Sequence, residues 1–190
     1  ISEKPTGISV IIRELKKDKI AMASLSILGI LLMIVFIGSL LLDKEEVMKI
    51  SLLDKYAAPG EGFWLGADTG GRDILGQLII GARNSIVVGI AVTILTSLIG
   101  IVVGLISGYY GGKIDNIIMR LVDFLTILPR LMLIIVFITV VPKYNLVTFI
   151  FIMSIFYWTG ITRLIRSKVL TESRRDYVHA SKTMGTSDFK

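Results

Sequence analysis

Long apolar runs, interrupted by short charged segments, dominate the chain. Residues 20–42 contain no charged side chain, and a helix of this length crosses a hydrocarbon core of roughly 30 Å at about 1.5 Å per residue. Residues 84–110, 117–141 and 144–164 form three further runs of similar length. The pattern therefore predicts four transmembrane helices, with a polar segment at residues 43–83 and polar segments at both ends.

The first run has an alternative interpretation as a secretory signal peptide. The apolar core of such a peptide is shorter, about 7–15 residues, and a small-residue cleavage site follows it closely. Residues 20–42 are too long and lack such a site, so we interpret them as a membrane span.

The third run differs because it carries Arg120, Asp123 and Arg130. Their spacing places them on one face of a helix. Charges in lipid are costly, so this face is expected to look into protein or water. Pro129 removes a backbone hydrogen bond and is expected to bend the helix.

Composition supports the membrane class. Of the 190 residues 53% are hydrophobic, and the mean hydropathy of +0.76 exceeds that of a typical soluble domain. The chain has no cysteine, which excludes disulfide frameworks and thiolate metal sites. His179 is the only histidine, so neither a histidine-rich metal site nor a Ser-His-Asp triad is expected. We expect an all-α integral membrane protein without metal-binding or catalytic residues.

Loop charges predict the orientation in the membrane. Residues 1–19 contain five Lys or Arg, the segment from Arg163 onward contains seven, and residues 43–83 carry more acids than bases. By the positive-inside rule, the N-terminus and residues 165–190 lie on the cytoplasmic side of the cytoplasmic membrane, and residues 43–83 lie outside. The net charge of +6 then requires no nucleic-acid partner.

The N-terminal segment, residues 1–19, contains the stretch SVIIRELKKDKI, in which apolar positions alternate with charges. This predicts a short amphipathic helix lying on the inner leaflet, with a solvated basic tail as the alternative.

Glycines mark two places in the second span and after it. Gly100, Gly104 and Gly108 recur every four residues, a spacing that lets another helix approach closely. The following stretch GYYGGK is not a phosphate-binding loop, because the residues at the required Gly and Ser/Thr positions are Ser107 and Ile114. The Gly-Gly pair at 111–112 instead predicts a tight turn, and the chain shows no nucleotide site.

The segment before the second span is dense in Gly, Asp and Arg. Trp64 is typical of a membrane interface. Asp68, Arg72, Asp73 and Arg83 form a candidate ion-pair cluster that fixes the start of the span; an ordinary solvated loop is the alternative.

Three stretches follow one another along the chain: LGADTGGRDILGQLIIGARNSIVVG, then GYYGGKIDNIIMRLVD with a Pro at position 129, then RLIRSKVLTESRRDYVHASKTMGTSD. In this order they resemble permease subunits of ABC importers of the oligopeptide/dipeptide family. The first is similar to the family stretch LGTD-x-x-GRD…GAR-x-SL-x-VG and the last to the family's EAA loop, and the resemblance covers about residues 60–190. The extracytoplasmic motif comprises Asp68, Gly71, Arg72, Asp73, Gly81 and Arg83.

The resemblance implies a multi-span helical bundle of the type I ABC importer permease kind, of which this chain shows four of an expected six spans. The EAA loop of the family lies between the fourth and fifth spans and folds as a helix–turn–helix whose coupling helix contacts the cytoplasmic ATPase. The sequence ends within this motif, so we expect the chain to be incomplete. The implied ATPase-coupling residues are Tyr177, His179, Ala180, Ser181, Gly185, Ser187 and Asp188.

The chain departs from the family pattern at a few positions. His179 replaces the usual Glu, which leaves the ion pairing at this position open, and Ser181 replaces the second Ala. Gly185, which the turn needs, is retained. The extracytoplasmic motif differs at Ala67, Gly76 and Gln77.

The implied function is that of a permease subunit that translocates oligopeptides or dipeptides. The implied partners are a second homologous permease, two ABC ATPase subunits that bind ATP-Mg, an extracytoplasmic substrate-binding protein and the lipid membrane. Members of the family also carry nickel complexes and glycosides, so the cargo stays open. An ion channel subunit, or a four-span scaffold that recruits a cytoplasmic partner, are the alternatives.

For the translocation pathway, the sequence favours the face with Arg120, Asp123 and Arg130. Arg130 lies deep in its span, where the family does not normally have Arg, and a cation there could meet a peptide carboxylate. Pairing with Asp123 or with a partner helix is the alternative.

Overall fold

The computed structural model describes residues 8–60, 62–141 and 145–185, and their regular structure is helical. It divides into two compact units, Ile1–Ile86 and Val87–Lys190, each described below by itself. Within these residues, three helices are long and apolar enough to cross a membrane, and a bent pair of shorter helices passes the same test as one broken span. The expectation of an all-α, multi-span membrane protein is confirmed.

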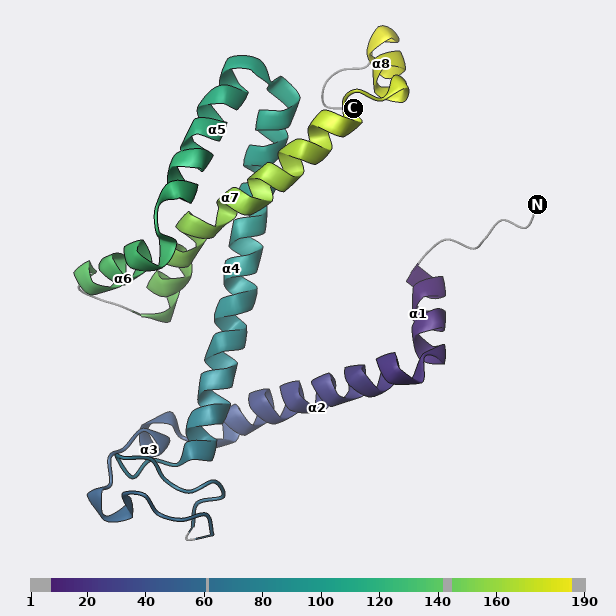
Figure 1. Cartoon of the computed structure of the whole chain (residues 1–190). Helices are drawn as coiled ribbons and strands as arrows, with labels where there is room; N and C mark the ends of the chain where they lie inside the picture. Colours follow the sequence, from purple (N-terminus) through teal and green to yellow (C-terminus); the bar gives the residue numbers. More distant parts are fainter. Residues whose placement is uncertain (1–7, 61, 142–144, 186–190) are drawn as a thin grey trace. The chain divides into compact units, whose positions relative to one another are not determined.

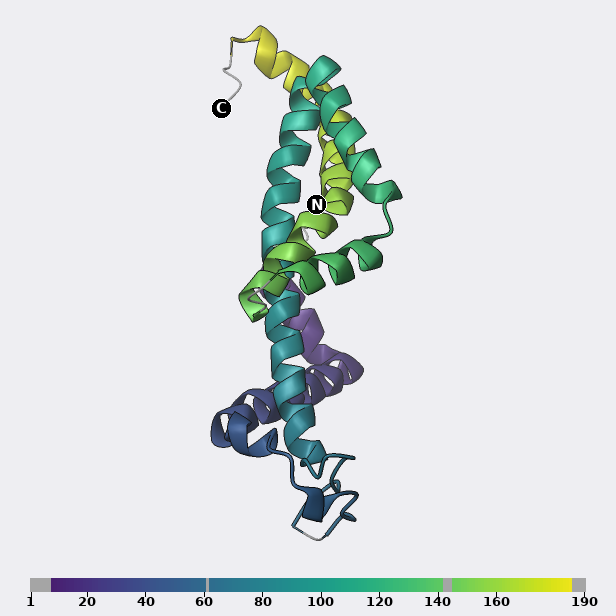
Figure 2. The ribbon, with the colours of Figure 1, turned by 90° about the vertical axis from the view of Figure 1, so that its left-hand side faces the viewer.

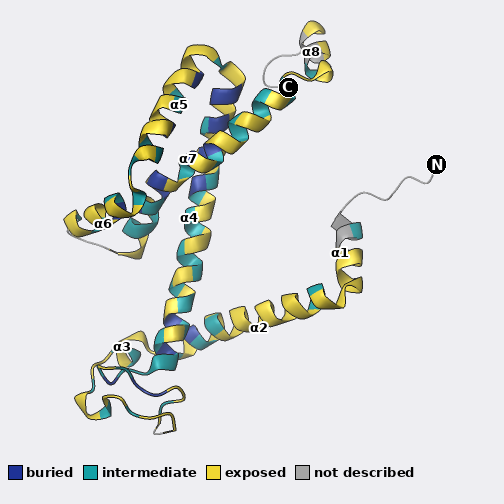
Figure 3. Ribbon diagram, in the orientation of Figure 1, coloured by how far each residue is buried: buried dark blue, intermediate teal, exposed yellow. Residues whose placement is uncertain are grey.

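The first unit begins with α1 (Ile8–Lys17) and α2 (Lys19–Leu41). Asp18 separates them, because its carboxylate accepts hydrogen bonds from the backbone N–H groups of Ile20 (2.9 Å) and Ala21 (3.1 Å) and so caps α2. Nearly all of α2 is exposed (Figure 3), and Ser39 is its one buried residue. A helix that is apolar all round and uncovered by protein fits a lipid environment.

A loop with the short helices α3 (Lys44–Val47) and η1 (Leu52–Asp54) leads to α4. A Cβ added at Gly76 would lie 2.7 Å from Val47, so α3 packs tightly on the first turn of α4. A Cβ added at Gly38 would lie 3.4 Å from Ile79, so the end of α2 packs one turn further along.

The helix α4 (Ile74–Tyr110) begins at Ile74 and not at Asn84, so residues 74–83 are helical. Its 37 residues make about 55 Å of helix at about 1.5 Å per residue, well beyond a hydrocarbon core of roughly 30 Å. Part of α4 must therefore project beyond the hydrocarbon core.

The second unit holds the rest of α4 together with α5 (Gly112–Ile127), α6 (Arg130–Val140), α7 (Leu146–Glu172) and α8 (Asp176–Thr183). The turn between α4 and α5 is made by glycines 111 and 112, whose φ angles are 61° and 55°. Figures 1 and 2 show α7 alongside both α5 and the end of α4. A small apolar core of Ile134, Ile152 and Phe156 joins α6 to α7.

The third predicted span is two helices and not one. α5 and α6 meet at 82°, on either side of Leu128 and Pro129. Proline cannot donate the hydrogen bond that would continue α5, and it pushes the preceding residue into the extended region, where Leu128 has φ −67° and ψ 137°. The prediction of one charged face is therefore wrong, because Arg130 lies on a different helix from Arg120 and Asp123.

Candidate functional site

The three spaced glycines lie where α4 and α7 pack against each other. A Cβ added at Gly100, Gly104 or Gly108 would come within 2.7–2.8 Å of the Cβ of a β-branched residue on α7. Those α7 residues are Ile161, Ile165 and Val169. Residues spaced four apart on α4 face residues spaced four apart on α7, and the glycines of α4 allow the close approach because they have no side chains.

An ion pair joins three helices beside this contact. Arg166 of α7 donates from Nε and Nη2 to the two carboxylate oxygens of Asp115 on α5, with Nη2–Oδ2 at 2.5 Å. The buried hydroxyl of Ser107 on α4 donates to Asp115 Oδ1 at 2.5 Å. Asp115 is only 9% exposed, so its charge depends on these donors.

A second ion pair lies further along α5 and α7. Arg163 Nη2 is 2.6 Å from Asp123 Oδ1 and 3.5 Å from Thr126 Oγ1. Asp123 therefore pairs with Arg163 of α7. It does not pair with Arg130, for which the sequence had left Asp123 or a partner helix as the alternative partner. Arg120 is exposed and makes no ion pair with any residue that the structure describes.

Arg130 occupies the first position of α6, directly after the break. Its Nη2 donates to Thr159 Oγ1 at 3.3 Å, and its Cζ lies 5.6 Å from the centre of the Tyr157 ring. Both contacts come from α7, so Arg130 holds the start of α6 against that helix by a hydrogen bond and a cation–π contact.

The end of α7 is tied to α8 through Glu172. This carboxylate accepts a hydrogen bond from the Tyr177 hydroxyl at 2.9 Å and lies 2.9 Å from Arg175 Nε. The hydrogen bond to Glu172 raises the pKa of the Tyr177 hydroxyl, because ionisation would place two negative charges together. α8 thus continues from α7 through an ordered turn.

The coupling residues predicted from the resemblance lie on and after α8. Tyr177 and Ala180 are exposed, and the Ala180 carbonyl accepts from the Met184 N–H at 3.1 Å. Gly185 has φ 80°, the left-handed conformation that the predicted turn requires. His179 and Ser181 belong to α8, and the calls on Ser187 and Asp188 lie outside the described residues.

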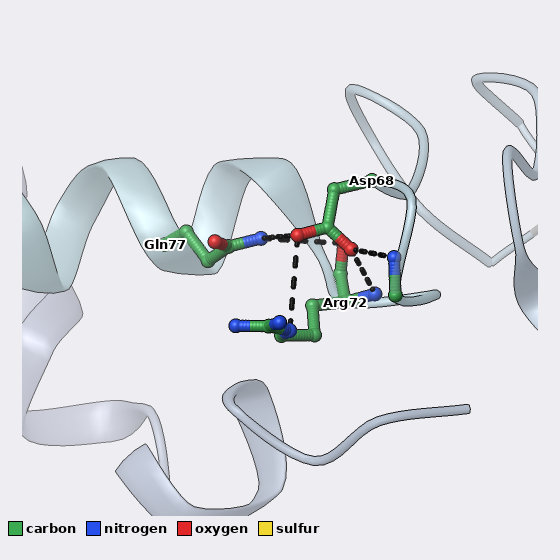
Figure 4. Close-up of polar contacts among 4 residues, drawn as sticks. Asp68, Arg72 and Gln77 are labelled. Carbon is green, nitrogen blue, oxygen red and sulfur yellow. Dashed lines mark hydrogen bonds and ion pairs between the residues drawn. The ribbon is translucent and has the colours of Figure 1, made fainter. Parts of the chain in front are cut away.

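In the first unit, Asp68 organises the loop before α4 (Figure 4). Its Oδ1 accepts from the backbone N–H groups of Gly70 (2.8 Å) and Arg72 (3.0 Å), and its Oδ2 accepts from Gln77 Nε2 at 3.2 Å. The Arg72 Nε lies 3.8 Å away. The hydrogen bond from the Arg72 N–H is the main cause that lowers the pKa of Asp68 below its ordinary value.

The other residues of the loop motif have separate places. Asp73 caps α4, accepting from the backbone N–H groups of Leu75 and Gly76, both at 3.1 Å. Gly71 is buried and donates its N–H to the Asp68 carbonyl at 3.0 Å. Gly81 and Arg83 are exposed on α4. The predicted four-residue ion-pair cluster is therefore wrong, because within the described residues only Asp68 and Arg72 of the four form an ion pair.

Sequence reasoning missed the partners Ser107, Asp115, Arg163 and Arg166. The available signal was weak: Asp115 is the acidic residue of the matched stretch GYYGGKID, and both arginines belong to the matched stretch RLIRS. Nothing in their spacing shows that residues 51 positions apart meet.

Residues 100–190 match the family described as the inner membrane component of binding-protein-dependent transport systems. The match covers α5 to α8 and the part of α4 that packs on α7, and it confirms the resemblance that the sequence motifs predicted.

The relatives are named as peptide permeases. The chain is 51% identical over 178 residues, 93% of its length, to the oligopeptide transport system permease protein OppC of Lactococcus lactis subsp. lactis. It is 38% identical over 178 residues to the dipeptide transport system permease protein DppC of Bacillus subtilis. The chain spans 60% of the length of the first relative and 55% of the second.

Proposed function

We propose that the chain is a membrane-spanning permease subunit of an ATP-driven ABC importer that moves oligopeptides or dipeptides into the cell. The observation that carries the proposal is the continuity from α7 into α8, within residues that match a transport family. Helix α7, on which the glycines of α4 pack, would thereby link the membrane spans to α8, a segment able to contact a partner protein.

The proposed importer function also implies the partners of the chain. A second homologous permease would complete the pathway, two ABC ATPase subunits would bind ATP-Mg, and an extracytoplasmic binding protein would deliver the peptide. This chain would be the non-catalytic membrane subunit. ATP-driven closure of the ATPases would push α8, and α7 would carry the movement to α5 through Arg166 and Asp115.

In this arrangement the N-terminus and α8 lie on the cytoplasmic side of the cytoplasmic membrane, and the loop organised by Asp68 lies on its outer side. The basic segments at both ends support this orientation, because Lys and Arg accumulate on the cytoplasmic side. The exposed apolar surface of α2 supports a place for that helix in lipid.

The alternatives gain no support. A channel subunit would need a continuous charged face along the third span, and the break at Pro129 divides that face. A scaffold would not require the turn and helix α8 that follow α7, and the relatives are named as permeases.

Purification of the native protein from source membranes in mild detergent tests the proposal. A P-loop ATPase and a second permease should be retained, and the complex in proteoliposomes with its binding protein should take up peptide only with ATP. Retention of neither partner would overturn the proposal.

Variants of two glycines sharpen this experiment. Gly185→Val forces a β-branched residue into φ 80° and should release the ATPase while keeping the second permease. The matched control is Gly89→Ala, since Gly89 is exposed on α4 and an added Cβ meets nothing within 4 Å. Equal ATPase retention by both variants would count against α8 as the contact.

A further inference from the structure

Within the described part of the second unit, some arginines have a carboxylate partner and others do not. Arg166 pairs with Asp115, Arg163 pairs with Asp123, and Glu172 is held by Arg175. Arg130 has no carboxylate partner among the residues that the structure describes; its contacts are the Thr159 hydroxyl and the Tyr157 ring. It is therefore a half-buried positive charge that keeps donors to spare.

The location of Arg130 makes this unusual. Thr159 is the middle residue of α7, a 27-residue spanning helix, and its side chain is 1% exposed. Arg130 therefore lies beside a buried residue within a spanning helix, at the 82° break between α5 and α6. Ionisable groups within membrane spans face the interior of a bundle or a polar pathway, and broken spans commonly line such pathways.

The contacts of Arg130 hold its guanidinium in place and leave most of its N–H donors unengaged within the described residues. Arginine has five N–H donors, and one of them is engaged by Thr159. The Tyr157 ring supports the cation at 5.6 Å and leaves the hydrogen-bonding edge of the guanidinium available. A planar fork fixed in this way is suited to bind a carboxylate through two hydrogen bonds.

We propose that Arg130, positioned by Thr159 and Tyr157, binds the C-terminal carboxylate of the peptide during translocation. This rests on the proposed importer function. Every unmodified linear peptide ends in a carboxylate, so one fixed cation would engage cargo without reading its side chains. The side chain of Arg130 is half-buried, so water screens its charge less than that of a surface cation, which strengthens the attraction.

The test compares two cargoes that differ only at the C-terminus: one peptide as the free acid and as its amide. Uptake is measured in proteoliposomes containing the complete transporter, with the binding protein saturated by each cargo after its affinity for both has been determined. Wild-type uptake that requires ATP establishes transport by itself, so failure of the importer function and failure of the Arg130 site remain distinguishable.

Arg130→Met should lower free-acid uptake about tenfold and leave amide uptake within about twofold, because only the acid loses its partner. Arg130→Lys should retain part of the preference, since it keeps the charge without the fork. Thr159→Val should weaken the preference less than Arg130→Met. The matched control is Lys113→Met, which removes an exposed cation from α5 and should change neither uptake.

Two results would overturn the proposal. If Arg130→Met lowers uptake of acid and amide equally, Arg130 serves the packing of α6 or pairs with an acid of the partner subunit. If it lowers neither, Arg130 does not meet the cargo. A thermal unfolding curve of each purified variant shows whether a loss of folding accounts for an equal decrease.

Discussion

Arg166 and Asp115 lie 51 positions apart in the sequence and form a two-point ion pair that ties α7 to α5. Ser107 brings α4 into the same cluster by donating to the Asp115 carboxylate. Gly108, the residue after Ser107, packs on Val169 and the Arg166 carbonyl, so an apolar contact and an ionic contact coincide. Helix crossing and charge pairing therefore depend on each other at this end of the second unit.

Removing one partner of this pair should destabilise the protein strongly. Asp115→Asn and Arg166→Gln each leave a poorly solvated charge without its counterpart, a change that costs about 3–5 kcal/mol in buried pairs. The Arg166 side chain is 30% exposed, so we expect the lower end of that range or less. Thermal unfolding in detergent, followed by the fluorescence of Trp158 on α7, measures the loss.

The double variant Asp115→Asn with Arg166→Gln should be less destabilised than the sum of the two single variants, because no lone charge remains. Ser107→Ala serves as the control and should cost only about 1 kcal/mol, the value of one hydrogen bond. Strictly additive losses in the double variant would show that the two residues are not coupled.

The contact between α4 and α7 predicts a position-specific penalty for added side-chain volume. Gly104→Ala would place a Cβ 2.8 Å from both Ile165 Cβ and the Thr162 carbonyl oxygen. One of these atoms is backbone and cannot rotate away, so we expect a destabilisation of about 1–3 kcal/mol. Gly89→Ala on the same helix meets nothing and should be neutral or slightly stabilising. Equal melting temperatures for the two variants would contradict the close packing of α4 on α7.

The apolar pattern predicted where the spans lie but not where the helices end. Arg83 interrupts the apolar run, so the second span was expected to begin at Asn84. In the structure α4 begins at Ile74, because Asp73 caps its first turn and Arg83 is simply exposed on the helix. A hydropathy pattern describes the part of a helix suited to lipid, whereas capping residues determine its ends.

The ion pairs show the other limit of sequence reasoning. The alternative pairing of Arg130 with Asp123 relied on helical spacing, which holds only while one helix continues. Proline 129 breaks that helix, and Asp123 instead meets Arg163, 40 positions away. Periodicity describes neighbours within a helix, and a single sequence holds no comparable signal for contacts between helices. The glycine spacing succeeded in predicting close packing because small residues have few other uses at that spacing.

The loop before α4 should depend on the charge of Asp68. The Asp68 carboxylate accepts two backbone N–H groups of the loop, and its pKa lies below the ordinary value of 3.8. Its contribution to stability is therefore fully present above the ordinary pKa and is lost as the pH falls through the lower pKa of the folded loop. Asp68→Asn should remove this contribution, so the stability of the loop should no longer change with pH in this range.

Hydrogen exchange at neutral pH, read by mass spectrometry, measures the loop directly. The Gly70 and Arg72 amides should lose protection in Asp68→Asn, while the amides in the middle of α4 stay protected. Thr69→Ala, one position along the same turn, is the control and should behave as the wild type. Unchanged protection in Asp68→Asn would show that the backbone bonds of the loop, not this carboxylate, hold it together.

The break between α5 and α6 should depend on Pro129. Pro129→Ala supplies the missing N–H donor and relieves the restriction on Leu128, so α5 is free to continue through this position. The natural chain has no cysteine, and a pair of spin labels can therefore be placed at the exposed positions Phe124 and Val136 without other changes. In the wild type the 82° bend shortens the distance between the labels, and Pro129→Ala should lengthen it toward that of a straight helix.

Straightening would also move Arg130 away from Thr159, so the free-acid preference in uptake should fall together with the bend. Leu131→Ala changes an exposed side chain just after the break and should alter neither measurement. A lengthened distance with unchanged cargo preference would separate the bend from the binding of the carboxylate. An unchanged distance would mean that the contacts of Arg130 and the apolar core of α6 hold the bend without the proline.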